Sequence, residues 1–183
     1  MPTLLQGEAC QTHSLRGAVT IYKKKLPDLT TFGITDLTDI TVLGDTHFHG
    51  ISTVVKGTFR DITASGPLTL TLTKAEKLTV HGPLEADRCA FSDNLAINGP
   101  VNMKSTTAKD VTVHYNKITL ENTIIDTLVI KWDPEKNLGT PPEVFLKGNT
   151  QVKTIIFEGT EGIIRKSEAS QCPDVRNSVV KRL

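Results

Sequence analysis

Net charge, aromatic residues and long apolar runs are all scarce in this chain, and each scarcity excludes a class of function. The 183 residues carry 21 Lys and Arg against 20 Asp and Glu, a formal net charge of +1. Nucleic acids and anionic membranes attract basic proteins, so electrostatics gives this chain no reason to bind either. No apolar run approaches the ~18 residues of a membrane-spanning helix, so no transmembrane segment is expected. Aromatic residues make up 5% of the chain, too few for a platform on which bases or sugars stack.

Cysteine is also scarce, and the 3 cysteines leave at least one thiol unpaired. A disulfide between Cys10 and Cys172 would have to join the two ends of the chain, so free thiols are the expected state. The N-terminal segment MPTLLQGEAC lacks the basic start and apolar core of a signal peptide. The protein is cytoplasmic if Met1 is its natural first residue, and periplasmic or secreted if a leader was removed.

Threonine, by contrast, is abundant, with 26 residues. It is β-branched and fits a pleated sheet, which favours an all-β fold. The chain also repeats itself every 16 to 17 residues. Successive rows of the repeat begin at Thr30, Thr46, Ile62, Leu78, Leu95, Val111 and Val144.

Equivalent positions of successive rows share their polarity. The third position is expected to point inward and holds Phe32, Phe48, Ala64, Val80, Ile97, Val113, Val129 and Leu146. Apolar residues alternate with polar ones around this position, which indicates strands with one buried face. Gly66-Pro67, Gly82-Pro83 and Gly99-Pro100 then end the strand and turn the chain, because proline donates no backbone hydrogen bond.

Three short strands and three corners in each repeat predict a single-stranded, three-sided parallel β-helix, or β-solenoid. Right-handed coiling is favoured by the general preference of parallel crossovers. We expect an N-terminal segment and cap at 1–29, the solenoid at 30–164, and a tail or capping helix at 165–183. The row 127–143 is expected to form a loop. The alternative fold is an antiparallel sandwich or Greek-key barrel, but hairpin turn signals are scarce.

The pattern I/L/V-x-V/I-x-G-P followed by V/L-x-A/L, over about residues 30–160, resembles the bactofilins, which are polymer-forming cytoskeletal proteins of bacteria. It is also similar to other short-coil, right-handed β-helix proteins of bacteria. The resemblance implies end-to-end stacking of the β-helix into filaments without a nucleotide. The chain departs from the bactofilins in its His- and Thr-rich first strand, in the row around Trp132 and in its basic C-terminal tail.

Catalytic and cofactor-binding motifs are missing from the sequence. It contains no GxxxxGK[ST], GxGxxG, GxSxG, HExxH or CxxC, and its carboxylates are scattered. We therefore expect no catalytic residue, no cofactor and no metal. A hydrolase or lyase acting on polysaccharides is the least favoured class of function.

The outward positions of the first strand form a candidate binding strip of small, nearly uncharged side chains. It consists of His47, His49, Thr63, Ser65, Thr79, His81, Asn98, Thr112 and His114. A solvated β face is the simplest interpretation, and a surface for another protein, a glycan or a second copy is the functional one. His49 and His81 would lie roughly 10 Å apart, too far to share a metal ion. Histidine gains a proton near pH 6, so binding through the strip should weaken there.

These observations favour a non-catalytic structural or interaction β-solenoid, which associates with itself or with another protein through its coil ends or sheet faces. The alternative is a bacterial secreted or periplasmic module that binds a glycan or a protein through the strip.

Overall fold

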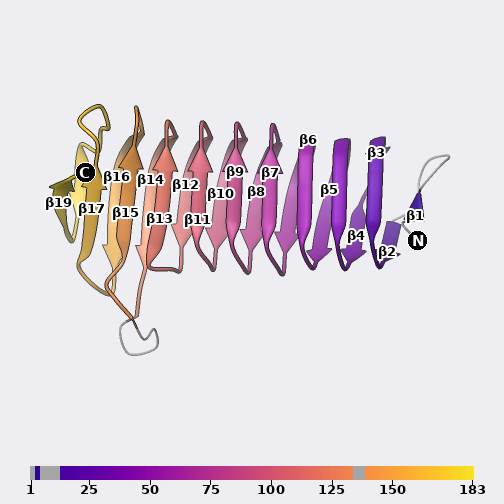
Figure 1. Cartoon of the computed structure of the whole chain (residues 1–183), viewed down its shortest axis with the longest axis horizontal. Helices are drawn as coiled ribbons and strands as arrows, with labels where there is room; N and C mark the ends of the chain where they lie inside the picture. Colours follow the sequence, from indigo (N-terminus) through magenta and orange to yellow (C-terminus); the bar gives the residue numbers. More distant parts are fainter. Residues whose placement is uncertain (1–2, 5–12, 134–138) are drawn as a thin grey trace.

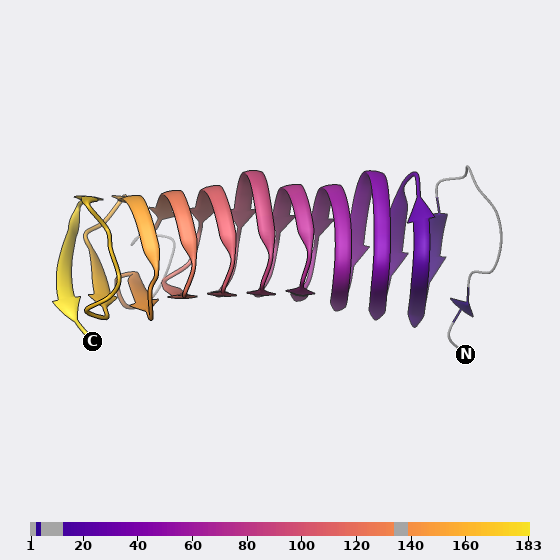
Figure 2. The same ribbon diagram turned by 90° about the horizontal axis from the view of Figure 1, so that it is seen from above.

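Strands cover nearly all of the chain, as the alternation of apolar and polar residues predicts. The computed structural model describes residues 3–4, 13–133 and 139–183, which form a parallel β-solenoid of about 10 turns without a helix (Figure 1). The all-β solenoid expected from the sequence is thereby confirmed. The coils follow one another along the rod in chain order, so the N- and C-terminal coils lie at opposite ends (Figure 2). No helix in the described part of the chain is long and apolar enough to cross a membrane.

The strands fall into two groups by length. The shorter ones are β1 (Thr3–Leu4), β2 (His13–Arg16), β4 (Leu29–Phe32), β7 (Leu68–Thr71), β9 (Leu84–Asp87), β11 (Val101–Lys104), β13 (Lys117–Glu121), β15 (Glu143–Lys147), β17 (Gly162–Lys166), β18 (Asp174–Arg176) and β19 (Ser178–Arg182). The longer ones, which span corners between faces, are β3 (Val19–Leu26), β5 (Thr35–His49), β6 (Ser52–Ala64), β8 (Lys74–Val80), β10 (Ala90–Ile97), β12 (Thr107–Val113), β14 (Ile124–Lys131) and β16 (Gln151–Glu158).

Equivalent residues of successive coils lie side by side in parallel register. Leu78 pairs with Ile62 on one side and with Leu95 on the other. Inward side chains consequently form columns along the rod. One fully buried column consists of Thr31, Phe48, Ala64, Val80, Ile97, Val113, Ile130 and Phe157. The large Phe48 lies between the smaller Thr31 and Ala64, which balances side-chain volume along the column.

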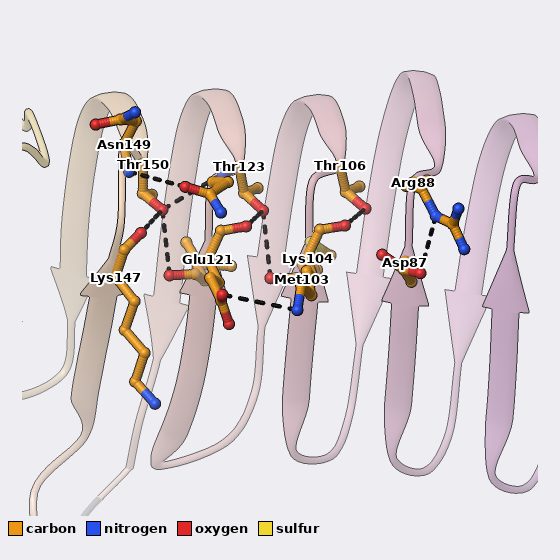
Figure 3. Close-up of polar contacts among 12 residues, drawn as sticks. Asp87, Arg88, Met103, Lys104, Thr106, Glu121, Thr123, Lys147, Asn149 and Thr150 are labelled. Atoms are coloured by element: carbon orange, nitrogen blue, oxygen red, sulfur yellow. Dashed lines mark hydrogen bonds and ion pairs between the residues drawn. The ribbon is translucent and has the colours of Figure 1, made fainter.

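A second inward column stabilises the corner between two faces through hydrogen bonds. In each central coil a residue with positive φ, such as Arg88 (53°) or Asn122 (49°), turns the backbone, and a small polar side chain behind it points inward. This polar column consists of Thr73, Cys89, Thr106, Thr123 and Thr150 (Figure 3). The hydroxyl oxygen of Thr123 lies 3.0 Å from the Glu121 carbonyl oxygen and 3.2 Å from that of Met103 on the preceding coil. Many threonines of the sequence thus serve inside the corner rather than on the surface.

The terminal segments belong to the solenoid to a greater extent than the sequence analysis assigned. Strands β2 and β3, within the expected cap 1–29, pair in parallel with β4 and β5. Residues 165–183 contain strands β18 and β19 rather than a capping helix, because they continue the register of β16 and β17. The proposed partner of Cys172, Cys10, lies outside the described residues.

Two parts of the predicted register were wrong. Phe32 does not share a column with Phe48, because Gly33 and Gly50 are 17 positions apart and Thr31 takes the inward place. Val129 faces outward beside Thr112, while its neighbour Ile130 is buried.

The insertion accounts for the second error. Thr127–Lys131 stays in strand β14, so the irregular segment begins after it rather than at 127. Val144 and Leu146 then pair with Ile118 and Leu120 on a different face from the one predicted.

Candidate functional site

The structure brings every residue of the predicted strip onto one outer face of the solenoid. His47 and His49 flank the buried Phe48, so strand alternation turns both imidazoles outward. The same alternation exposes, fully or in part, Thr63, Ser65, Thr79, His81, Asn98, Thr112 and His114. We call this surface the strip face.

The strip face contains two outward columns. The first consists of Thr30, His47, Thr63, Thr79, Ala96, Thr112, Val129 and Ile156. The second consists of Arg16, Phe32, His49, Ser65, His81, Asn98, His114, Lys131 and Glu158. Coils stack at ~4.8 Å, so each side chain of a column can contact the next.

Contacts between neighbours order the second column along much of its length. The Phe32 and His49 rings are stacked, with centroids 4.6 Å apart and planes at 9°. The side-chain amide nitrogen of Asn98 lies 2.9 Å from Nδ1 of His81. At the far end the ammonium of Lys131 lies 3.4 Å from a Glu158 carboxylate oxygen.

Sequence reasoning missed both ends of this column. Phe32 and Arg16 were lost because the first repeats were aligned one residue out of register. The glycines at 17, 33 and 50 occupy one corner column, and aligning them would have revealed the correct register. Lys131 was assigned to a loop, and Glu158 lies beyond the insertion that interrupts the repeat.

The electrostatics of the strip face are uneven. The second column from His49 to His114 contains no residue that is charged when histidine is neutral. Arg16 supplies a positive charge at one end, and Glu158 supplies a negative charge at the other. The guanidinium carbon of Arg16 lies 4.9 Å from the Phe32 ring centroid, within the range of a cation–π contact.

Metal binding receives no support from the geometry of the strip. Across residues 3–4, 13–133 and 139–183, no three His, Cys, Asp or Glu side chains gather closely enough to hold an ion. His47 and His49 therefore have no third ligand within the described residues.

A shallow groove lies on the neighbouring face of strands β9, β11 and β13. Its walls are Pro83, Leu84, Glu85, Pro100, Val101, Asn102, Tyr115, Asn116, Lys117 and Thr119. Tyr115 is 36% exposed, and the groove places its ring near amide and carboxylate side chains. An aromatic ring beside a few polar groups is a common composition for a small-ligand site.

The C-terminal end of the solenoid carries charge where the core would continue. Lys166 pairs with Leu146, and Arg182 pairs with Lys166, so both cations follow a column of buried leucines. The Lys166 ammonium donates to the Ser170 carbonyl at 3.1 Å. Inward-pointing charges of this kind disfavour the addition of a further strand to an edge.

Comparison with known proteins adds no relative. No protein-family model matches the chain, and no match was found among curated proteins or solved structures. The fold and its surface define a parallel β-solenoid with a long polar strip, and the likeness to the bactofilins depends on the sequence repeat alone.

Proposed function

We propose that this protein is a non-catalytic structural or interaction protein whose contacts are made through the strip face. The observation that supports this most strongly is the second column, in which small or planar side chains run along nine coils with an uncharged centre. Flat sheet surfaces with little charge lose less solvation free energy on contact than charged ones. Association with a second copy or with another protein follows from such a surface.

The sheet face is favoured over the coil ends as the contact surface. A second copy stacked on β19 would bury the cations of Lys166 and Arg182 in an apolar column. Burial of unpaired charges is costly. This argument separates the present proposal from the end-to-end filaments that the bactofilin resemblance implies.

Light scattering over a protein concentration series tests the proposal. The wild-type protein should increase in mean mass with concentration, and the variant Thr79→Lys should remain a monomer. Thr53→Lys is the matched control, because Thr53 is also a half-buried outward threonine, on the face of β6 and β7. If neither association nor ligand binding is detected for the wild type, or if Thr53→Lys abolishes it equally, the proposal is wrong.

Glycan binding is the second candidate, and a different surface favours it. The groove beside Tyr115 combines an aromatic ring with Asn102, Asn116 and Glu85, which together can contact the apolar face and the hydroxyls of a sugar. A glycan array probed with the wild type and with Tyr115→Ala tests this candidate. Signal that is lost in Tyr115→Ala but kept in Thr79→Lys would assign glycan binding to the groove, and an array without signal would contradict it.

A further inference from the structure

We infer that the partner of the strip face is a second copy of this chain, packed face to face and antiparallel, with the two-fold axis passing beside His81. This inference rests on the proposed function and adds the partner and its orientation. It is based on the order of side chains in the second column, which is complementary to itself when reversed.

The symmetry of the contact determines which residues meet. When a two-fold axis lies parallel to the strands, each outward column faces the same column of the other copy in reverse order. Centred on His81, the second column then places Arg16 opposite Glu158, Phe32 opposite Lys131, His49 opposite His114, Ser65 opposite Asn98, and His81 opposite itself.

Each of these pairs is chemically favourable. Arg16 and Glu158 carry opposite charges, and the Lys131 ammonium meets the ring of Phe32 in a cation–π contact. A neutral imidazole has one donor and one acceptor nitrogen, so His49 can hydrogen-bond to His114. The hydroxyl of Ser65 and the amide of Asn98 are likewise complementary.

The first column allows the two sheets to approach. In the same arrangement Thr63 meets Ala96, His47 meets Thr112, and Thr79 meets itself. These side chains are mostly small, which suits the ~10 Å spacing of two packed sheets. No charge of this column lies at the centre of the contact.

A parallel arrangement is disfavoured by the same residues. With the axis along the rod, every residue lies at the height of its own copy, so Arg16 approaches Arg16 and Glu158 approaches Glu158. Like charges across an interface destabilise it. The antiparallel order replaces both repulsions with two equivalent attractions.

The size of the contact predicts a weak dimer. Nine coils at ~4.8 Å give a length of about 43 Å, and four residues at ~3.3 Å give a width of about 13 Å. The face therefore buries about 1,100 Å² in both copies together, just below the range of stable interfaces. Dimerisation should consequently depend on concentration.

Site-specific cross-linking tests the orientation. Single cysteines are introduced into a Cys10→Ser, Cys172→Ser background that keeps the buried Cys89, and a short bis-maleimide linker is added. His81→Cys should cross-link to itself, whereas His49→Cys should cross-link mainly to His114→Cys in a mixture. Thr53→Cys, on another face, should remain a monomer.

Charge exchange gives an independent readout that does not depend on cysteine. Arg16→Glu should raise the dissociation constant of the dimer about tenfold, because two symmetric pairs are lost. Arg16→Glu combined with Glu158→Arg should restore the wild-type value.

The outcomes separate this inference from the proposed function. If Thr79→Lys abolishes self-association but His49→Cys cross-links to itself as efficiently as His81→Cys, the antiparallel dimer is wrong while the strip face remains the contact. Failure of the double charge exchange to restore association would likewise overturn it. A strip face that binds only a different protein or a glycan would overturn the second copy as its partner.

Discussion

The ring of Phe32 lies parallel to the imidazole of His49 on the next coil, with 4.6 Å between the centroids. Arg16, on the preceding coil, places its guanidinium 4.9 Å from the centroid of the same ring. Exposed side chains thus connect three successive coils at the N-terminal end of the strip face. This contact both stabilises the first coils and ends the uncharged part of the column.

Removal of the Phe32 ring should destabilise the solenoid. Phe32→Ala is expected to lower the free energy of unfolding by about 1 kcal/mol, because it removes a stacked pair and a cation–π contact. Urea denaturation followed by circular dichroism measures the change. The control is Phe145→Ala, which removes an outward, half-buried ring from β15. Equal losses in the two variants would mean that the stacking on His49 contributes nothing specific.

The polar column inside the corner predicts a cost for the loss of a single hydroxyl. Thr123→Val keeps the shape of the side chain but leaves the carbonyls of Met103 and Glu121 without their donor. We expect a loss of about 1–2 kcal/mol in the free energy of unfolding. Thr112→Val, on the outer surface, should change it by less than about 0.5 kcal/mol. Urea denaturation of both variants provides the comparison, and an unchanged Thr123→Val would refute a structural role for the column.

Inward charges at the C-terminal coil predict a gain of association when they are removed. The double variant Lys166→Leu, Arg182→Leu would continue the apolar column of Leu120 and Leu146 to the end of the rod. Negative-stain images should then show rods longer than the single solenoid. The matched control is Arg165→Leu, Lys181→Leu, which changes outward neighbours on the same strands. Rods of single length in both variants would indicate that these charges do not block the end.

Burial governs the chemistry of Cys89. Desolvation raises the pKa of its thiol, and Sγ also lies 3.4 Å from the carbonyl oxygens of Leu70 and Asp87. Alkylation by iodoacetamide requires the thiolate, so the native protein should react slowly at pH values where an ordinary thiol reacts. The same shift should lower stability as the pH rises through the ordinary thiol range, because the fold favours the protonated form.

Mass spectrometry of the Cys10→Ser, Cys172→Ser variant measures the alkylation directly. The modified fraction should be small in native protein and complete in denaturant. Rapid labelling of the native protein would contradict the inward position of Cys89 in the polar column.

The sequence carried the architecture because stacking repeats the same environment in every coil. Residues such as Leu78 and Leu95 occupy equivalent places, so their spacing alone predicts parallel neighbours. The register of single coils was harder to predict. A coil can contain 16 or 17 residues, and at Phe32 an apolar residue in the expected position was taken as inward although Thr31 is buried there.

The strip face was predictable only in its regular part. His47 through His114 follow the uninterrupted repeat, and strand alternation alone turns them outward. Lys131 and Glu158 are neighbours in space but lie on either side of an insertion, so sequence spacing does not connect them. The inward threonines were equally hidden, because a threonine suits both a solvated strand and a hydrogen-bonded corner.

Histidine footprinting over a protein concentration series tests the strip face most directly. Diethyl pyrocarbonate modifies accessible imidazoles, and His47, His49, His81 and His114 all lie on this face, while His13 precedes the buried-facing Leu15 side of β2 and serves as an internal reference. We predict that modification of the strip-face histidines falls as concentration rises, with His13 unchanged, and that Thr79→Lys removes this protection. Reactivity of the strip-face histidines that does not change with concentration would contradict self-association through this surface.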